Sequence, residues 1–212
     1  SFGRGAMTNH WVDFKNSDVI LIMGSNPASN HPVSWKWIQH AVDNRGAKII
    51  CVDPRFTQSA AKAHLYAPLR SGTDIAFLGG MIKYILDNKL YFEEYVKNYT
   101  NASFLVNPAF KLPGENKGVF SGFTNGKYEK DTWSYQTDAV GVIKKDKSLT
   151  DPNCVFQLLK KHYSRYTPEL VSRITGCPKD KLVEVYKLYG STGKPDKAGV
   201  DLYAMGWTQH TV

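Results

Sequence analysis

The chain has 212 residues, of which 42% are hydrophobic, and its 27 Lys and Arg against 19 Asp and Glu give a net charge of +8. A chain of this size and composition can bury a core of its own, which excludes disordered and collagen-like proteins. The longest apolar run, residues 19–23, is too short to span a membrane, and three scattered cysteines match no disulfide framework or metal-ligand spacing. The positive charge favours an anionic partner, either a nucleic acid or a polyphosphate cofactor.

The first half of the chain predicts a strand, a helix and a second strand. Residues 18–23 form an uninterrupted aliphatic run ending at Gly24, which is typical of a strand buried on both faces. Apolar residues recur at helical spacing over residues 31–44, and residues 47–52 are a second strand candidate. This order indicates a βαβ unit with parallel strands.

The same pattern continues with a third strand at residues 65–69 and a helix at residues 73–87, which Thr73 is expected to cap. The apolar residues expected on the inner face of that helix are Ile75, Leu78, Ile82 and Ile85. The other predicted elements are a short helix at residues 91–99, helices at 154–162, 168–174 and 179–189, and a last strand at 199–205.

These elements predict an α/β fold with an open, mostly parallel, Rossmann-like sheet and helices on both faces. Residues 1–106 are the predicted cofactor-binding segment. Residues 107–150 lose all periodicity and contain scattered glycines, so we expect an irregular insertion of loops and hairpins there. Residues 151–212 form a helical segment that returns to the sheet with its final strand.

Ligands bind to such a sheet beyond the carboxyl ends of its strands. Residues 24–31 have one glycine where the dinucleotide fingerprint has three, so they do not favour a standard nicotinamide site. Their hydroxyl and amide groups suit a phosphate, although a turn that only caps the helix has the same composition. Asp53 can accept hydrogen bonds from a sugar diol or a purine edge, and Arg55 can pair with a phosphate, although Asp-Pro-Arg is also an ordinary turn.

Two further loops have the same character. Residues 70–74 combine a glycine, a hydroxyl and a carboxylate at a helix start, and residues 205–210 place a glycine beside Thr208 and Gln209. Polar groups on several successive strand ends favour a shared binding site over a packing requirement alone. The candidate cofactor-binding residues are Gly24, Asn26, Ser29, Asp53, Arg55, Arg70, Ser71, Gly72, Asp74, Met205, Gly206, Thr208, Gln209 and His210. No acid, base and nucleophile fall together in one constellation, so we predict no catalytic residue and no metal ligand in this segment.

These loops together resemble the catalytic subunits of molybdenum and tungsten bis-pyranopterin guanine dinucleotide oxidoreductases. The resemblance rests on residues 3–11 (GRGAMTNHW), 24–32 (GSNPASNHP), 52–57 (VDPRFT), 67–76 (APLRSGTDIA) and 202–210 (LYAMGWTQH). The last of these stretches and residues 162–168 (HYSRYTP) are similar to formate dehydrogenases in particular.

The resemblance implies that the guanine dinucleotide of one of two pyranopterins crosses the sheet edge. Asp53 and Asp74 would lie near guanine or ribose, and Arg55, Ser71 and Asn26 near phosphates. It also implies that the molybdenum or tungsten ligand, the 4Fe-4S cysteines and the formate-orienting arginine lie outside residues 1–212, in the rest of a longer, multidomain subunit.

The implied reaction is the oxidation of formate to CO₂, with two electrons leaving through iron-sulfur clusters to an iron-sulfur beta subunit and a cytochrome. The resemblance further implies a periplasmic location, with no nucleic acid partner and no membrane span in this segment. Two alternatives stay open. One is a nitrate, arsenate or polysulfide reductase of the same superfamily. The other is a stand-alone nucleotide-binding module. The sequence lacks the aromatic RNA-binding signature that would support this second alternative.

Overall fold

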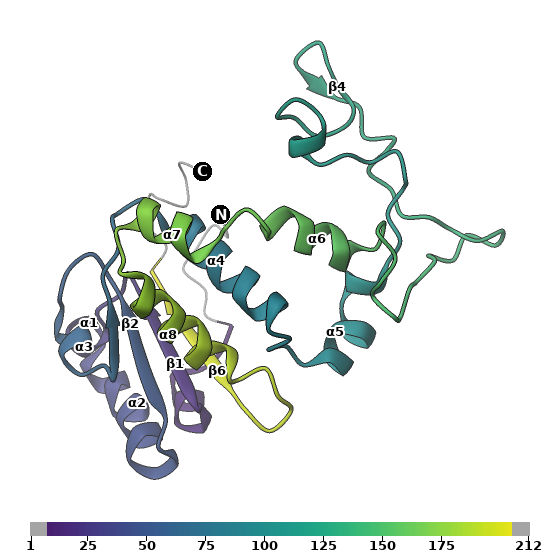
Figure 1. Cartoon of the computed structure of the whole chain (residues 1–212). Helices are drawn as coiled ribbons and strands as arrows, with labels where there is room; N and C mark the ends of the chain where they lie inside the picture. Colours follow the sequence, from purple (N-terminus) through teal and green to yellow (C-terminus); the bar gives the residue numbers. More distant parts are fainter. Residues whose placement is uncertain (1–7, 205–212) are drawn as a thin grey trace. The chain divides into compact units, whose positions relative to one another are not determined.

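The computed structural model describes residues 8–204, and their contacts divide the chain into two compact units (Figure 1). Unit 1 comprises Ser1–Tyr91 and Tyr166–Val212, and unit 2 comprises Phe92–Arg165. The predicted insertion, residues 107–150, lies within unit 2.

Unit 1 is built on a four-stranded sheet in the order β3-β2-β1-β6. The strands are β1 (Val19–Met23), β2 (Lys48–Val52), β3 (Leu65–Ala67) and β6 (Gly199–Tyr203), and every pairing is parallel. This confirms the predicted α/β fold with a parallel sheet. Strand β3 is shorter than the predicted 65–69 because residue 68 is a proline, which has no N–H to continue the ladder.

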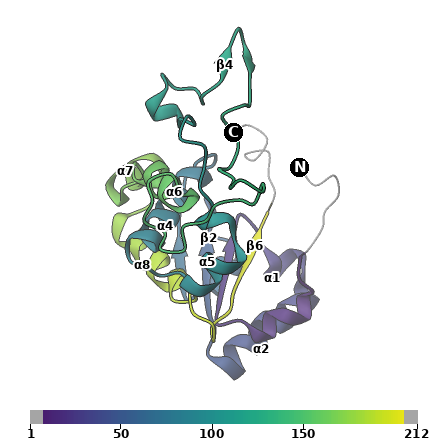
Figure 2. The ribbon, with the colours of Figure 1, turned by 90° about the vertical axis from the view of Figure 1, so that its right-hand side faces the viewer.

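Helices cover both faces of the sheet, as predicted (Figure 2). One face carries α4 (Asp74–Asp87), α7 (Pro168–Thr175) and α8 (Lys179–Gly190). The other carries η1 (Trp11–Asn16), α1 (Pro27–Asn30), α2 (Pro32–Arg45) and α3 (Gln58–Ala61). Successive strand residues point to opposite faces of the sheet. Leu21 and Ile50 therefore lie in the core under α4, α7 and α8, and Ile20 and Ile49 lie in the core on the other face. Burial on both faces explains why β1 is apolar throughout.

The buried face of α4 differs from the one predicted. Ile75 is 48% exposed, whereas Phe77 and Gly80 are buried. The reason is close helix packing, since a Cβ atom at Gly80 would lie 2.7 Å from the Tyr186 hydroxyl oxygen and 2.9 Å from Val171 Cγ2. The Tyr186 hydroxyl also donates to the Phe77 carbonyl at 2.8 Å. The other predicted positions, Leu78, Ile82 and Ile85, are half-buried.

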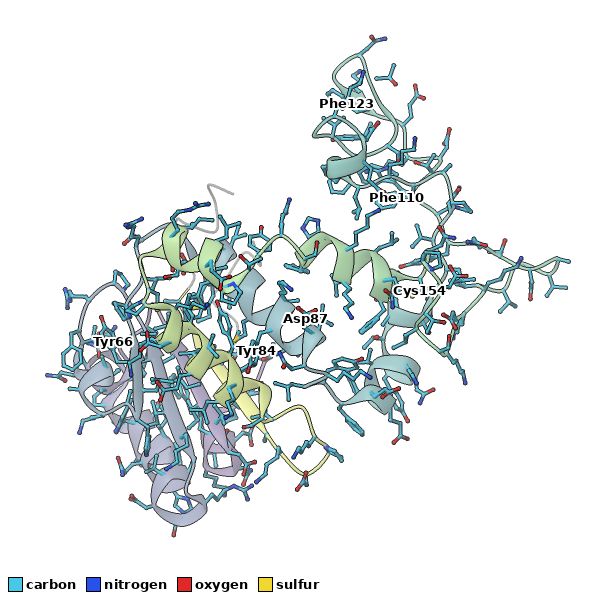
Figure 3. The ribbon with its side chains drawn as sticks, viewed as in Figure 1. Tyr66, Tyr84, Asp87, Phe110, Phe123 and Cys154 are labelled. Carbon is cyan, nitrogen blue, oxygen red and sulfur yellow. The ribbon has the colours of Figure 1, made fainter. Side chains whose placement is uncertain are left out.

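Unit 2 has little regular structure and a small core. Its elements are α5 (Glu93–Tyr99), η2 (Asn101–Ser103), η3 (Pro113–Glu115), β4 (Phe123–Thr124), β5 (Lys127–Tyr128) and α6 (Val155–Tyr163). Strands β4 and β5 form an antiparallel hairpin. Phe110, Phe123 and Cys154 are labelled in Figure 3; the two phenylalanines belong to a series of ring contacts through Phe120, Trp133 and Tyr128.

One carboxylate organises a turn in unit 2. Asp146 accepts hydrogen bonds from the backbone N–H groups of Ser148, Thr150 and Asp151 at 2.7–2.9 Å. These bonds favour the ionised form and lower the pKa of Asp146 to about 2. Across residues 8–204, the structure has no helix that is long and apolar enough to cross a membrane.

Candidate functional site

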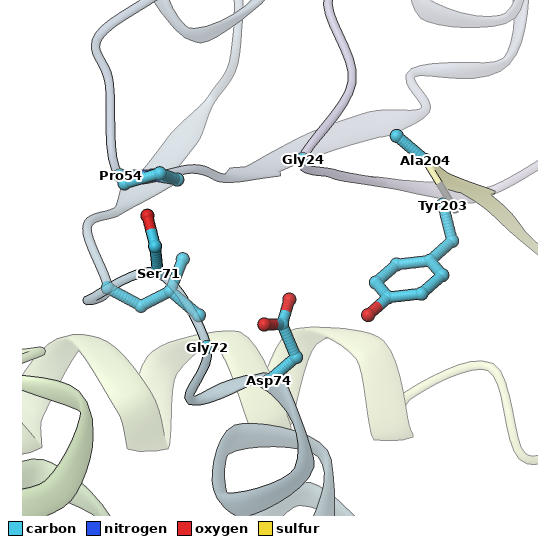
Figure 4. A pocket seen from close by; sticks show the side chains of 8 residues that line it. Gly24, Pro54, Ser71, Gly72, Asp74, Tyr203 and Ala204 are labelled. Atoms are coloured by element: carbon cyan, nitrogen blue, oxygen red, sulfur yellow. The ribbon is translucent and has the colours of Figure 1, made fainter. Parts of the chain in front are cut away.

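A small pocket lies at the carboxyl edge of the unit 1 sheet (Figure 4). It is lined by Gly24, Pro54, Leu69, Ser71, Gly72, Asp74, Tyr203 and Ala204. These residues follow or end strands β1, β2, β3 and β6, so parallel pairing brings together four segments that are far apart in the sequence. The cavity, of about 140 Å³, is smaller than a whole-cofactor pocket and suits one part of a larger ligand.

Polar side chains face this cavity from two sides. Figure 4 shows the Asp74 carboxylate and the Tyr203 hydroxyl group pointing into it from α4 and β6. Asp74 is in the first turn of α4. Together they offer an acceptor and a hydroxyl, which can bind the N–H groups of a base or the hydroxyl groups of a sugar.

The start of α4 is open to an anion. Thr73 occupies the N-cap position, but its hydroxyl donates to the Arg70 carbonyl at 2.6 Å and makes no capping bond, so the predicted capping role is wrong. The cause is the turn at Gly72, whose φ of +84° folds the chain back toward residue 70. The first N–H groups of the helix have no capping side chain here, and such groups bind phosphates.

The loop after β1 is fastened to the segment after β2. The Asn26 side-chain oxygen accepts from the N–H of Ser59 at 3.2 Å and from its hydroxyl at 2.8 Å. The Asn26 amide donates to Ser29 at 2.9 Å, and Ser29 in turn donates to Gln58 at 2.8 Å. Asn26 and Ser29 therefore hold two edge loops together, and neither lines the pocket.

Asp53 and Arg55 lie beside the pocket. Asp53 is buried, and one of its carboxylate oxygens accepts from the Arg55 N–H at 2.8 Å. Burial and the Asp53 carboxylate raise the pKa of the Cys51 thiol to about 12. Arg55 is exposed and forms no ion pair with any residue between 8 and 204, so its guanidinium can still meet a phosphate.

Arg70 turns toward α7. Its Nη1 donates to the carbonyls of Arg173 at 3.2 Å and Ile174 at 3.3 Å, and its backbone N–H donates to Thr175 at 2.7 Å. Arg70 is therefore the first residue of the pocket loop, which we define as residues 70–74, and its side chain does not line the cavity.

The structure brings part of the predicted set together. Of the candidates, Gly24, Ser71, Gly72 and Asp74 line the pocket, whereas Asn26, Ser29, Asp53, Arg55 and Arg70 do not. Met205, Gly206, Thr208, Gln209 and His210 lie outside the described residues. The sequence analysis missed Pro54, Leu69, Tyr203 and Ala204 as lining residues. Tyr203 ends β6, but the sequence analysis extended that strand to residue 205, so its position at a strand end gave no signal.

The site has binding groups and no cluster of metal ligands. Within residues 8–204, no group of three or more His, Cys, Asp or Glu side chains could hold a metal ion. Carboxylate and hydroxyl groups, an uncapped helix start and glycine turns together fit the nucleotide part of a cofactor.

Comparison with known proteins gives one family match and several similar relatives. A family model described as molybdopterin oxidoreductase matches residues 3–168. The chain is 58% identical to the formate dehydrogenase subunit alpha of Megalodesulfovibrio gigas and 51% identical to the nitrate-inducible formate dehydrogenase major subunit of Escherichia coli K12. Each match covers 100% of this chain and 21% of the relative, so the chain spans about a fifth of the length of these curated relatives.

A solved structure shares the fold. Acetylene hydratase from Pelobacter acetylenicus matches with a TM-score of 0.57 and 24% sequence identity, over 90% of this chain and 18% of that one.

Proposed function

Because this chain belongs to the molybdopterin oxidoreductase family, we propose that it is a segment of a formate dehydrogenase catalytic subunit. The observation that carries the proposal is the 58% identity to a formate dehydrogenase alpha subunit across the whole chain. The nitrate, arsenate and polysulfide reductase alternatives and the stand-alone nucleotide module have no comparable support.

In this proposal the carboxyl edge of the sheet binds the guanine dinucleotide of one of two pyranopterins. The open N-terminus of α4 and the exposed Arg55 supply donors for phosphate oxygens. Asp74 supplies an acceptor for guanine or ribose, and Gly72 lets the backbone approach closely. Asp53 lies next to the pocket, where it can accept a further bond from the same ligand.

The residues of this chain bind and orient, and the cofactor supplies the redox chemistry. When bound, the molybdenum- or tungsten-containing group accounts for the two-electron oxidation of formate to CO₂ and a proton. A rigid sheet edge fixes the position of the group relative to formate, whose contacts lie elsewhere in the subunit. Contacts to a nucleotide tail contribute the same binding free energy in the ground state and in the transition state. They therefore control how many molecules hold the cofactor more than they control the turnover rate.

The rest of the enzyme follows from the same proposal. A 4Fe-4S cluster elsewhere in the subunit would carry the two electrons one at a time to an iron-sulfur beta subunit and onward to a cytochrome. The enzyme would work in the periplasm. The relatives are named as subunits of formate dehydrogenases, which supports a multisubunit enzyme. The cluster, the cytochrome and the periplasmic location rest on the motif resemblance given in the sequence analysis.

The test uses the complete subunit that contains this chain. Purified protein should release guanine nucleotide on acid denaturation, contain molybdenum or tungsten, and reduce an artificial dye with formate. Asp74→Ala should lower nucleotide and metal content together, by roughly ten-fold or more, because ligand donors in the pocket lose their acceptor. The matched control is Asp43→Ala, which removes an exposed carboxylate bonded to Gln39 on α2. Wild-type protein without guanine nucleotide, or without formate-dependent dye reduction, would refute the proposal.

A further inference from the structure

The carbonyl groups in the last turn of α7 have an unusual set of partners. A helix leaves its last four carbonyls without partners inside the helix. In α7 the Ser172 carbonyl accepts from the N–H of Gly176 at 2.8 Å. The other three, on residues 173, 174 and 175, all accept from Arg70. One residue of the pocket loop therefore completes the end of a helix about a hundred positions later in the chain.

The local chemistry favours this contact. The carboxyl end of a helix carries partial negative charge, so a guanidinium is stabilised there. Gly176 leaves the room that Arg70 needs, since a Cβ atom at residue 176 would lie 3.2 Å from Arg70 Nε. Its φ of +73° is also the left-handed conformation that glycine adopts most easily.

Arg70 also accepts a hydrogen bond from within the pocket loop. The Arg70 carbonyl accepts from the Thr73 hydroxyl at 2.6 Å, and the Thr73 carbonyl accepts from the Phe77 N–H at 3.1 Å. These bonds connect the end of α7 through residue 70 to the start of α4. Of the pocket-lining residues, Ser71 and Gly72 lie between Arg70 and Thr73, and Asp74 directly follows Thr73.

We infer that Arg70 is a positioning residue, which binds the last three carbonyls of α7 and thereby holds Ser71, Gly72 and Asp74 in place for the ligand. This inference rests on the proposed function, because its readout is cofactor occupancy. It replaces the role of direct cofactor ligand that the sequence suggested for Arg70.

The test is a double-mutant cycle in the complete subunit, with guanine nucleotide per subunit as the readout. Arg70→Ala removes the guanidinium, and Gly176→Ala fills the space beside it. Each should lower occupancy by roughly ten-fold, and the double variant should also lose roughly ten-fold, far less than the hundred-fold expected of independent sites. Molecules that keep the cofactor should turn over at the wild-type rate per metal.

Two controls separate positioning from a general loss of stability. Gly46→Ala places alanine at the left-handed end of α2, where φ is +68° and no atom lies within 4 Å of the new Cβ. It carries the same backbone strain as Gly176→Ala without an arginine to displace. Arg45→Ala removes an exposed arginine that pairs with Asp18 at 3.4 Å. Both controls should stay within two-fold of wild-type occupancy.

The outcomes are distinguishable. Full occupancy in Arg70→Ala, or fully additive losses in the double variant, would overturn the positioning role. Loss of occupancy in Gly46→Ala equal to that in Gly176→Ala would also overturn it, because strain alone would then explain the effect. Wild-type protein without guanine nucleotide would instead refute the proposed function, and the inference with it.

Discussion

Gly80 should not tolerate even a methyl group. In Gly80→Ala the added Cβ would lie 2.7 Å from the Tyr186 hydroxyl oxygen and 2.9 Å from Val171 Cγ2. Neither neighbour can move into solvent, since both side chains have 0% exposure, and Tyr186 is anchored to the Phe77 carbonyl. Overpacking of this kind costs about 1–3 kcal/mol, and weakening the tyrosine hydrogen bond about 1 kcal/mol more. The better helix propensity of alanine offsets about 1 kcal/mol, so we expect a net destabilisation of about 1–3 kcal/mol.

Native-state hydrogen exchange on α4 and α8 measures this local free energy of opening. Tyr186→Phe removes the oxygen nearest to the new methyl group, so combining it with Gly80→Ala should recover part of the loss. Unchanged or increased protection of α4 in Gly80→Ala alone would refute the reasoning, because it would mean that the helices can separate at no cost.

Four further outcomes are expected. Asp53→Ala should lower guanine nucleotide retention by about 1–3 kcal/mol, measured as nucleotide content, and unchanged content would leave Asp53 as a turn residue only. Ser71→Ala should lower metal content with little change in turnover per metal, and the opposite result would place Ser71 beside the reaction. The folded-state pKa of Asp146 is lowered to about 2, so the stabilisation that the ionised carboxylate gives to the folded protein is present above the unfolded value near 3.9 and is lost as pH falls through about 2. At neutral pH, Asp146→Ala should remove the same stabilisation and speed tryptic cleavage after the adjacent Lys147. Cys51, whose pKa is raised to about 12, should resist alkylation at pH 8 in native protein and react once the protein is denatured.

The parts of the fold that the sequence predicted are those with local causes. Strand β1 was predictable because each of its five residues is buried on one face or the other. Residues 24, 71, 72 and 74, which line the pocket, drew attention in the sequence because glycines, a hydroxyl and a carboxylate follow predicted strands, and their contact with a cofactor stays a prediction. Helices α1 and α3 were missed, since four residues are too few to show a helical period.

The parts that escaped prediction depend on long-range contacts. The hydrogen bond between Ser59 and Asn26 joins residues 33 positions apart, and a single sequence carries no signal for that pair. Arg70 meets Ile174 across 104 residues. The exposure of Ile75 likewise follows from the glycine contact between α4 and α8, which periodicity alone does not reveal.

The position of β6 beside β1 has a consequence for synthesis of the protein. The Asp18 side chain before β1 accepts from the N–H of Ala198, 180 residues later in the chain, and β6 follows directly. At a translation rate of about 5–20 residues per second, the ribosome needs roughly 9–36 s to make that stretch. During this interval one hydrogen-bonding edge of an entirely apolar strand has no neighbour, which is the condition under which strands pair wrongly or aggregate. A nascent chain of this kind therefore keeps an apolar strand edge unpaired for the whole of this interval.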